Sequence, residues 1–118
     1  MHKCNENSKC IAVDYGYESI EKVIDMVSGK WKLRILYILS LSSCYRYGEL
    51  KKALGDISHK ILSQQLKDLE KSRLIIRTEY PERPLKVEYH LSDMGIGLIP
   101  VYEEFGKWIT KHIQELEL

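Results

Sequence analysis

The sequence has few of the residues that mark disulfide-rich and membrane proteins. Cysteine and proline occur three times each in 118 residues, and phenylalanine occurs once. An odd number of cysteines, without an apolar signal segment at the start of the chain, predicts reduced thiols in the cytoplasm rather than a disulfide framework. No apolar run approaches the ~20 residues that a helix needs to cross a bilayer, so we expect no contact with a membrane.

Catalytic and metal-binding motifs are also missing. The sequence contains no nucleophile elbow, no phosphate-binding loop and no pair of acidic residues in a glycine-rich setting. His2, Cys4 and Cys10 have a spacing that matches no standard zinc site. We therefore expect a protein that is not an enzyme and that holds neither a cofactor nor a metal ion.

Net charge is nearly absent, yet the charges are unevenly distributed. The chain carries 18 Lys+Arg and 17 Asp+Glu, which give a formal net charge of +1. The charge sums to −2 over residues 1–29, to +6 over 30–90 and to −3 over 91–118. A basic centre of this kind is typical of a surface that binds nucleic acid, although lysines on solvated helix faces would give the same composition.

The apolar periodicity of the chain indicates a single domain. Residues 1–17 lack this periodicity and are expected to form a flexible arm, with the domain extending over 18–118. Apolar residues at Ile20 and at positions 23, 24 and 27 predict an amphipathic helix over 18–27. The mostly apolar run 30–41 predicts a central helix that is buried on several sides.

A short helix, a tight turn and a longer helix are expected next. The run 47–54 has helical spacing, and Gly55 is suited to end the helix. Ser58 is a favourable N-cap for a second helix that extends to about Ser72. Two helices joined by three or four residues that include glycine are typical of a helix-turn-helix. In the second helix we expect a buried stripe made of Ile61, Leu62, Leu66 and Leu69.

Two runs with partial apolar alternation, 74–80 and 85–91, predict a β-hairpin with Arg83 at its tip. A C-terminal helical region is expected over 93–117, interrupted in its first turns by glycine and proline. Its broad apolar stripe consists of Leu98, Val101, Phe105, Trp108, Ile109, Ile113 and Leu116. Such a stripe exceeds what a small domain covers alone and favours packing against a second chain, the alternative being that the helix lies across its own domain.

The order of these elements predicts a mainly α fold with a small β-hairpin wing, an α+β winged helix-turn-helix. In such a fold the second helix of the helix-turn-helix enters the major groove of DNA. Short polar side chains near its start have the size and position to read bases, and lysines suit phosphates. The expected base-reading residues are Ser58, His59, Ser63 and Gln64, and the expected phosphate contacts are Lys60, Lys67, Lys71, Arg77 and Lys86. Arg83 at the hairpin tip is expected to enter a minor groove.

Several segments make the chain similar to a known family. They include Gly29-Lys30-Trp31, Arg46-Tyr47-Gly48-Glu49-Leu50, the run 57–66, and Tyr80-Pro81-Glu82-Arg83-Pro84. The chain closely resembles the HxlR family of bacterial winged-helix regulators, which are relatives of the MarR group. The resemblance implies a homodimeric transcription factor that binds an inverted repeat of double-stranded DNA. It adds Lys30 and Arg46 to the expected DNA contacts and implies an interface between the first and last helices that includes Ile20, Ile24, Val101, Phe105, Trp108, Ile109 and His112.

One departure from the family pattern concerns redox sensing. Many members have a Cys-Pro pair at the positions that Glu18 and Ser19 occupy here, and in several of them that cysteine senses oxidants. Cys4 and Cys10 in the arm are an alternative pair for a thiol- or metal-responsive regulator. A winged-helix protein-interaction module that binds no DNA is the alternative from another class, and a small-molecule inducer is a further possible partner.

Overall fold

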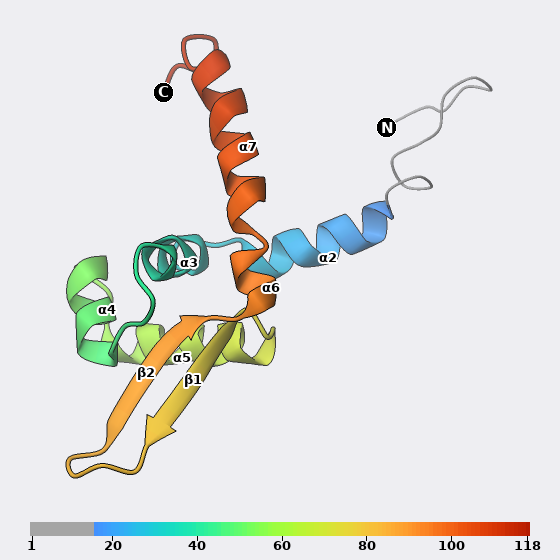
Figure 1. Ribbon diagram of the computed structural model, residues 1–118. Coiled ribbons are helices and arrows are strands. Elements are labelled where there is room, and N and C mark those ends of the chain that lie inside the picture. Colours follow the sequence, from blue (N-terminus) through green and yellow to red (C-terminus); the bar gives the residue numbers. More distant parts are fainter. Residues whose placement is uncertain (1–15) are drawn as a thin grey trace.

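The computed structural model describes residues 16–118. Helices α2 (Tyr17–Val27) and α3 (Lys32–Ser40) are followed by α4 (Tyr47–Leu54) and α5 (His59–Lys71). The strands β1 (Ile75–Tyr80) and β2 (Lys86–Leu91) form an antiparallel hairpin, and α6 (Asp93–Ile96) and α7 (Ile99–Lys111) end the chain (Figure 1). This order confirms the predicted mainly α fold with a hairpin wing. All but the last two residues of the expected N-terminal arm lie outside the described residues.

The helix-turn-helix forms as the sequence predicts. Gly55 ends α4 with a backbone φ of +80°, a conformation that favours glycine. Ser58 caps α5, because its hydroxyl oxygen accepts a hydrogen bond from the backbone N–H of Ile61 at 3.1 Å. The connection between α4 and α5 therefore has the length and the residues that the motif requires.

The apolar core lies between α3, α4, α5 and the base of the hairpin. Leu50 of α4 and Leu62 and Leu69 of α5 are completely buried, as is Ile35 of α3. Within residues 16–118 the buried apolar residues are Ile35, Leu36, Leu39, Leu50, Leu54, Ile57, Leu62, Leu66, Leu69, Leu74, Ile75, Tyr89 and Leu91. The core thus determines how α5 and the hairpin lie relative to each other.

Two expectations about buried helix faces were wrong. Ile61 is 42% exposed and does not belong to the buried stripe of α5. The stripe is centred on Leu62, and successive residues of a helix point about 100° apart, so Ile61 lies beside it. The helix α3 is buried on one side only, since Leu33 and Tyr37 are exposed on the side that faces α7.

The hairpin is attached to the rest of the domain by a contact that the sequence did not reveal. Tyr45, between α3 and α4, forms a β-bridge with Tyr89 of β2. Each residue donates its backbone N–H to the carbonyl of the other, at 2.8 and 2.7 Å. Beside this bridge, the Cys44 thiol donates to Oε2 of Glu88 at 3.4 Å, and Nζ of Lys86 lies 3.5 Å from the same oxygen.

The connection from the hairpin to the C-terminal helices is closely packed. The hydroxyl of Ser92 accepts from the N–H of Gly95 at 3.0 Å and donates to the carbonyl of Arg73 at 2.7 Å. The helical region then breaks between α6 and α7, where Gly97 and Leu98 stand, in agreement with the predicted interruption.

Helices α2 and α7 project from the body of the molecule (Figure 1). Neither helix contains a buried residue, and the molecule measures 65 × 32 × 24 Å along its principal axes. The alternative in which the last helix lies across its own domain is therefore wrong. Of its apolar stripe, Leu98 packs against the core, whereas Val101, Phe105 and Trp108 stay exposed in the single chain.

Replacing Gly95 by alanine should destabilise the fold. A Cβ at this position would lie 2.3 Å from the backbone carbonyl oxygen of Leu74, so backbone atoms would have to move. We expect a loss of about 1–3 kcal/mol in the free energy of unfolding, measured by urea denaturation. Gly48→Ala is the matched control, because a Cβ on Gly48 meets no atom within 4 Å, and we expect a gain of about 0.5–1 kcal/mol there. Equal unfolding midpoints for the two variants would contradict this account.

The contacts of Glu88 predict a pH dependence of stability. Hydrogen bonds from Cys44 and Tyr80, together with the charge of Lys86, hold the pKa of the Glu88 carboxyl below its ordinary value. The ionised carboxylate therefore stabilises the fold at neutral pH, and this contribution is lost as the pH falls below about 4.3. Glu88→Gln should flatten the decrease in the free energy of unfolding over this acidic range. Glu103→Gln on α7 is the control for loss of one negative charge, and the same flattening in both variants would refute the prediction.

Candidate DNA-binding surface

The exposed side of α5 carries a row of long polar side chains. Lys60, Gln64, Lys67 and Lys71 follow one another at helical spacing, opposite the buried leucines, and all four are exposed. Three of the four residues are cations. The row therefore has the length and charge to lie along a DNA groove and reach its phosphates.

Gln64 is held by its neighbours. Its amide nitrogen donates to Oδ1 of Asp68 at 3.0 Å, and Nζ of Lys32 lies 3.9 Å from Oδ2 of the same carboxylate. The carbonyl oxygen of the Gln64 side chain stays available, whereas a bidentate contact with adenine also requires the amide nitrogen to leave Asp68. Lys32, which no motif in the sequence marks as functional, thus joins the start of α3 to α5.

The first turns of α5 are in contact with Tyr47 of α4. The Tyr47 hydroxyl lies 3.1 Å from Nδ1 of His59, 3.2 Å from the His59 carbonyl oxygen and 3.4 Å from the Ser63 hydroxyl. The phenol ring stacks on the His59 imidazole, with ring centres 5.8 Å apart and planes at 10°. Ser58 uses its hydroxyl as the helix cap. All four expected base-reading residues, Gln64 included, are therefore already hydrogen-bonded within the protein.

The cations of the hairpin differ in their surroundings. Arg77 is bound to Glu79, which raises the pKa of the guanidinium. Lys86 pairs with a carboxylate of β2 and lies 5.1 Å from the centre of the Tyr80 ring. Arg83 stands in the exposed tip beyond the last paired residues of the two strands, and it forms no ion pair with any residue that the structure describes. It is consequently the hairpin cation that is freest to bind DNA.

A hollow of about 410 Å³ separates α5 from the hairpin. It brings Lys67 of α5 and Arg77 of β1 to the same depression, with Tyr47 also in its wall. The full lining is Tyr47, Ser63, Leu66, Lys67, Glu70, Arg77 and Tyr89. Residues that are far apart in the sequence thus line one depression between the helix and the wing, with two cations and one carboxylate among them.

The two remaining expected DNA contacts lie at helix starts. Arg46 is exposed and precedes α4, and its backbone N–H donates to Oε1 of Glu49 at 2.8 Å. Lys30 lies in the loop before α3, with its ammonium 4.7 Å from the centre of the Trp31 ring. The loop leads into the first turn of α3, where Lys32 pairs with Asp68 of α5.

Redox and metal chemistry find little support in the described part of the chain. Cys4 and Cys10 lie outside the described residues. The thiol of Cys44 is hydrogen-bonded to Glu88, and this bond and partial burial raise its pKa, which disfavours the reactive thiolate. Residues 16–118 contain no group of three or more His, Cys, Asp or Glu side chains placed to hold a metal ion. Within the same range, no helix has both the length and the apolar composition to span a membrane.

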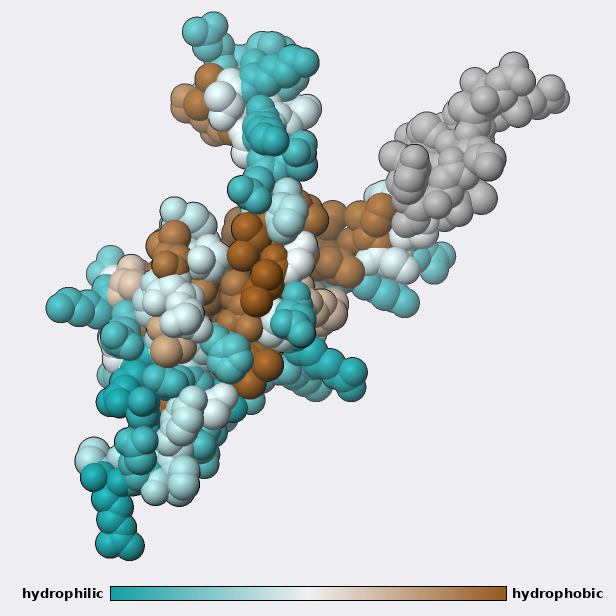
Figure 2. Space-filling model, viewed as in Figure 1, coloured by the Kyte–Doolittle hydropathy of each residue, from teal (hydrophilic) through white to brown (hydrophobic). Residues whose placement is uncertain are grey.

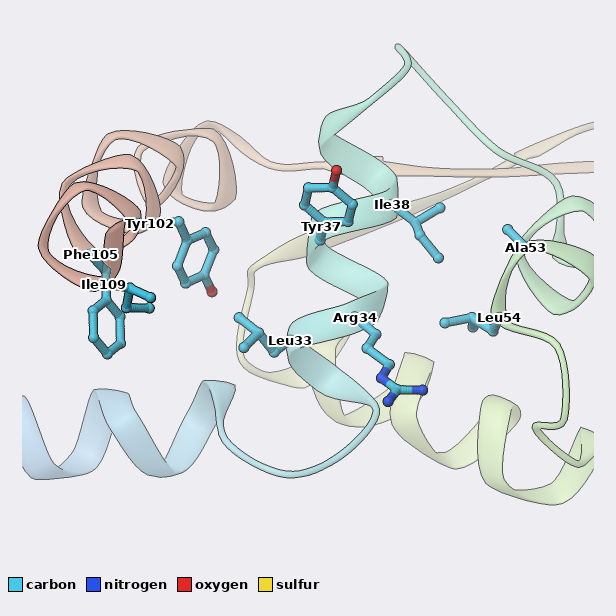
Figure 3. Close-up of a pocket in the computed structure, with 10 residues that line it drawn as sticks. Leu33, Arg34, Tyr37, Ile38, Ala53, Leu54, Tyr102, Phe105 and Ile109 are labelled. Atoms are coloured by element: carbon cyan, nitrogen blue, oxygen red, sulfur yellow. The ribbon is translucent and has the colours of Figure 1, made fainter. Parts of the chain in front are cut away.

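A second surface is apolar and uncovered. Phe105 and Trp108 of α7 are 61% and 51% exposed, and Ile24 of α2 is 55% exposed. Figure 2 shows apolar residues gathered where α2 and α7 leave the body, whereas the hairpin is hydrophilic. Between α7, α3 and the end of α4 lies a groove of about 640 Å³, into which the Tyr102 hydroxyl is buried without a hydrogen-bond partner (Figure 3). Its other lining residues are Leu33, Arg34, Tyr37, Ile38, Ala53, Leu54, Phe105, Gly106 and Ile109.

Known proteins share both the sequence and the fold. The chain is 51% identical over 88 residues to the uncharacterized HTH-type transcriptional regulator YdzF of Bacillus subtilis, covering 75% of this chain and 81% of the relative. The solved structure of a MarR-family transcriptional regulator from Enterococcus faecalis V583 superposes with a TM-score of 0.80 at 30% identity, covering 93% of this chain and 98% of that one. The redox regulator HypR in its reduced form gives a TM-score of 0.75 at 29% identity, covering 84% and 97%.

The match to a family model confirms the resemblance that the sequence motifs indicate. The model of the HxlR-like helix-turn-helix matches residues 26–117, which includes every described element except most of α2. The chain therefore belongs to the HxlR-like helix-turn-helix family, whose members are DNA-binding transcriptional regulators and not enzymes.

Proposed function

We propose that this regulator binds, as a homodimer, an inverted repeat in double-stranded DNA. Helix α5 of each copy would lie in a major groove, with the hairpin beside it reaching the adjacent minor groove. The observation that carries this proposal is the exposed row of Lys60, Gln64, Lys67 and Lys71, which lies on the side of α5 opposite the core. Because its target is chromosomal DNA, the regulator would act in the cytoplasm.

Phosphate contacts would supply most of the affinity. The segment 30–90, which contains α5 and the hairpin, carries the +6 charge, whereas the flanking segments are acidic. Neutralising phosphates releases the counterions condensed on DNA, so binding should weaken steeply as salt rises. The residues we assign to backbone and minor-groove contacts are Lys30, Arg46, Lys60, Lys67, Arg77, Arg83 and Lys86.

Base recognition would come from the first half of α5. Gln64 has a free carbonyl oxygen, and its amide nitrogen is held by a single exposed hydrogen bond, whose net value of roughly 0.5–1.5 kcal/mol a base contact can replace. Ser58, His59 and Ser63 lie in the same two turns. Their side chains are short and polar, as base-edge contacts require.

The two projecting helices support the dimer. A soluble chain rarely leaves a large apolar patch uncovered, and here the patch extends over α2, α7 and the groove beside α3. A second copy presents the same surfaces, so a two-fold arrangement would cover both patches at once. The proposed interface residues are Ile20, Ile24, Val101, Phe105, Trp108, Ile109 and His112. In the single chain, seven apolar or aromatic side chains of this surface are more than one-third exposed: Ile20, Val23, Ile24, Val101, Phe105, Trp108 and Ile113.

Two alternatives are distinguished by their ligands. A thiol-responsive form of the same regulator, using Cys4 and Cys10, is compatible with the fold shared with the redox regulator HypR. It predicts that diamide changes DNA affinity and that a reductant restores it.

A module that binds only proteins would not need the basic row on α5, and it predicts no salt-dependent DNA binding at all. A small-molecule inducer would act on either form of the regulator by changing the distance between the two recognition helices.

Substitutions on α5 should separate phosphate contacts from base contacts. An operator is first selected from a random duplex pool with the intact protein, and affinities for it and for unrelated duplex are measured at several salt concentrations. Lys67→Ala should weaken both by a similar factor and reduce the salt slope by about one. Gln64→Ala should lower the ratio of specific to unrelated binding by roughly 5- to 100-fold, because a good base contact contributes about 1–3 kcal/mol of discrimination. Equal losses on both duplexes for Gln64→Ala would exclude base reading by this residue.

A charge placed on the apolar face of α7 should separate the two copies. Phe105→Glu would bury a carboxylate in the proposed interface, so light scattering should give the mass of a single chain, 13.8 kDa. Affinity for the selected inverted repeat should fall roughly a hundredfold or more, because each half-site then binds by itself. Thr110→Glu adds the same charge on an exposed position of α7 away from the apolar stripe and should leave the dimer intact. A wild-type chain that is already monomeric at micromolar concentration would refute the dimer.

A further inference from the structure

Tyr47 belongs to α4, yet its side chain makes hydrogen bonds to the start of α5. Within residues 16–118, every hydrogen bond of its hydroxyl goes to His59 or Ser63. Its hydroxyl is within hydrogen-bond distance of Nδ1 and the carbonyl oxygen of His59 and of the Ser63 hydroxyl, at 3.1, 3.2 and 3.4 Å. Its ring is parallel to the His59 imidazole. One side chain therefore touches two of the proposed base-reading residues.

The chemistry of a phenol restricts how these contacts can be made. The hydroxyl has one proton to donate and lone pairs to accept. If it donates to the carbonyl oxygen of His59, then Nδ1 must carry a proton and donate to the phenol, which leaves Nε2 of a neutral imidazole as an acceptor. If it donates to Nδ1 instead, Nε2 carries the proton and is a donor. In both cases the Ser63 hydroxyl can donate to the phenol oxygen.

The direction of the Tyr47 hydroxyl thus decides what His59 presents to DNA. A base edge distinguishes donors from acceptors, so the tautomer of His59 selects which bases its Nε2 can contact. The stacked phenol ring also limits rotation of the imidazole. A group that is hydrogen-bonded to one ring nitrogen of a functional histidine usually fixes the tautomer and the orientation of the ring.

We propose that Tyr47 is a positioning residue for sequence recognition, which holds His59 and Ser63 in the orientation and hydrogen-bonding state that read the operator. The inference rests on the proposed role of α5 as the reading helix. Tyr47 lines the hollow between α5 and the hairpin, but the recognition it controls is made by the two residues it touches. If the ring only filled space between α4 and α5, loss of the hydroxyl would leave the ratio of specific to unrelated binding unchanged.

Tyr47→Phe tests the proposal, because it keeps the ring and its stacking and removes only the hydroxyl. With the full chain and the selected operator, we expect the ratio of specific to unrelated binding to fall roughly 5- to 10-fold, while affinity for unrelated duplex and the salt slope stay unchanged. Nitrogen chemical shifts of His59 should show a changed tautomer balance. Tyr45→Phe is the matched control, since the bonds of Tyr45 to β2 are made by backbone atoms.

A double-mutant cycle makes the test independent of any general loss of stability. In a His59→Ala background, Tyr47→Phe should have a clearly smaller effect on discrimination than in the intact chain, because the two residues act through the same contact. Unchanged discrimination in Tyr47→Phe, additive effects in the cycle, or equal losses on all duplexes would each overturn the proposal. A wild-type chain that prefers no duplex over another would instead refute the proposed function itself.

Discussion

Burial of one side of α5 is the constraint on which the rest of the molecule depends. Leu62, Leu66 and Leu69 repeat at helical spacing and are packed against α3 and α4, where Leu50 is also completely buried. Covering a leucine side chain stabilises the folded state by about 1.5–3 kcal/mol, so turning α5 about its axis would cost several times that amount. The same geometry directs Lys60 and the other long polar side chains of α5 to the solvent. Packing of the core therefore determines which residues can face DNA.

The wing is held relative to this helix by polar contacts as well as by the core. The paired backbone bonds between Tyr45 and Tyr89 join β2 to the segment that leads into α4. The Cys44 thiol and the Lys86 ammonium both bind the Glu88 carboxylate next to that bridge. Lys86 is a residue that the sequence connects with DNA, whereas Cys44 is not one of the two cysteines considered for redox sensing. Their positions give both residues a structural role in orienting the hairpin.

The terminal helices α2 and α7 differ from the central domain in that their apolar side chains are mostly exposed rather than buried. They carry seven exposed large apolar side chains, and no residue of α2 or α7 is buried. All buried members of the core lie between Ile35 and Leu91, and the terminal helices add only partly buried side chains at their inner ends, Met26 and Val27 of α2 and Ile99 of α7. In the proposed dimer, the fold of one chain would thus supply the DNA-reading surface, and association of two chains would set the distance between two such surfaces.

Local patterns in the sequence were sufficient for the elements and for the family. The caps Gly55 and Ser58, the leucine repeat of α5 and the hairpin follow from residue preferences that act over a few positions, and all of them are present in the structure. Tertiary contacts decided the rest: Ile61 is exposed, Tyr45 pairs with a strand 44 residues away, and Tyr47 hydrogen-bonds to α5. A lone bridge or a side-chain bond between distant segments leaves no periodic trace, because it depends on how elements pack in space. The sequence alone therefore determined a basic winged helix-turn-helix, and only the folded structure decided which polar groups of its reading helix are free and which are held.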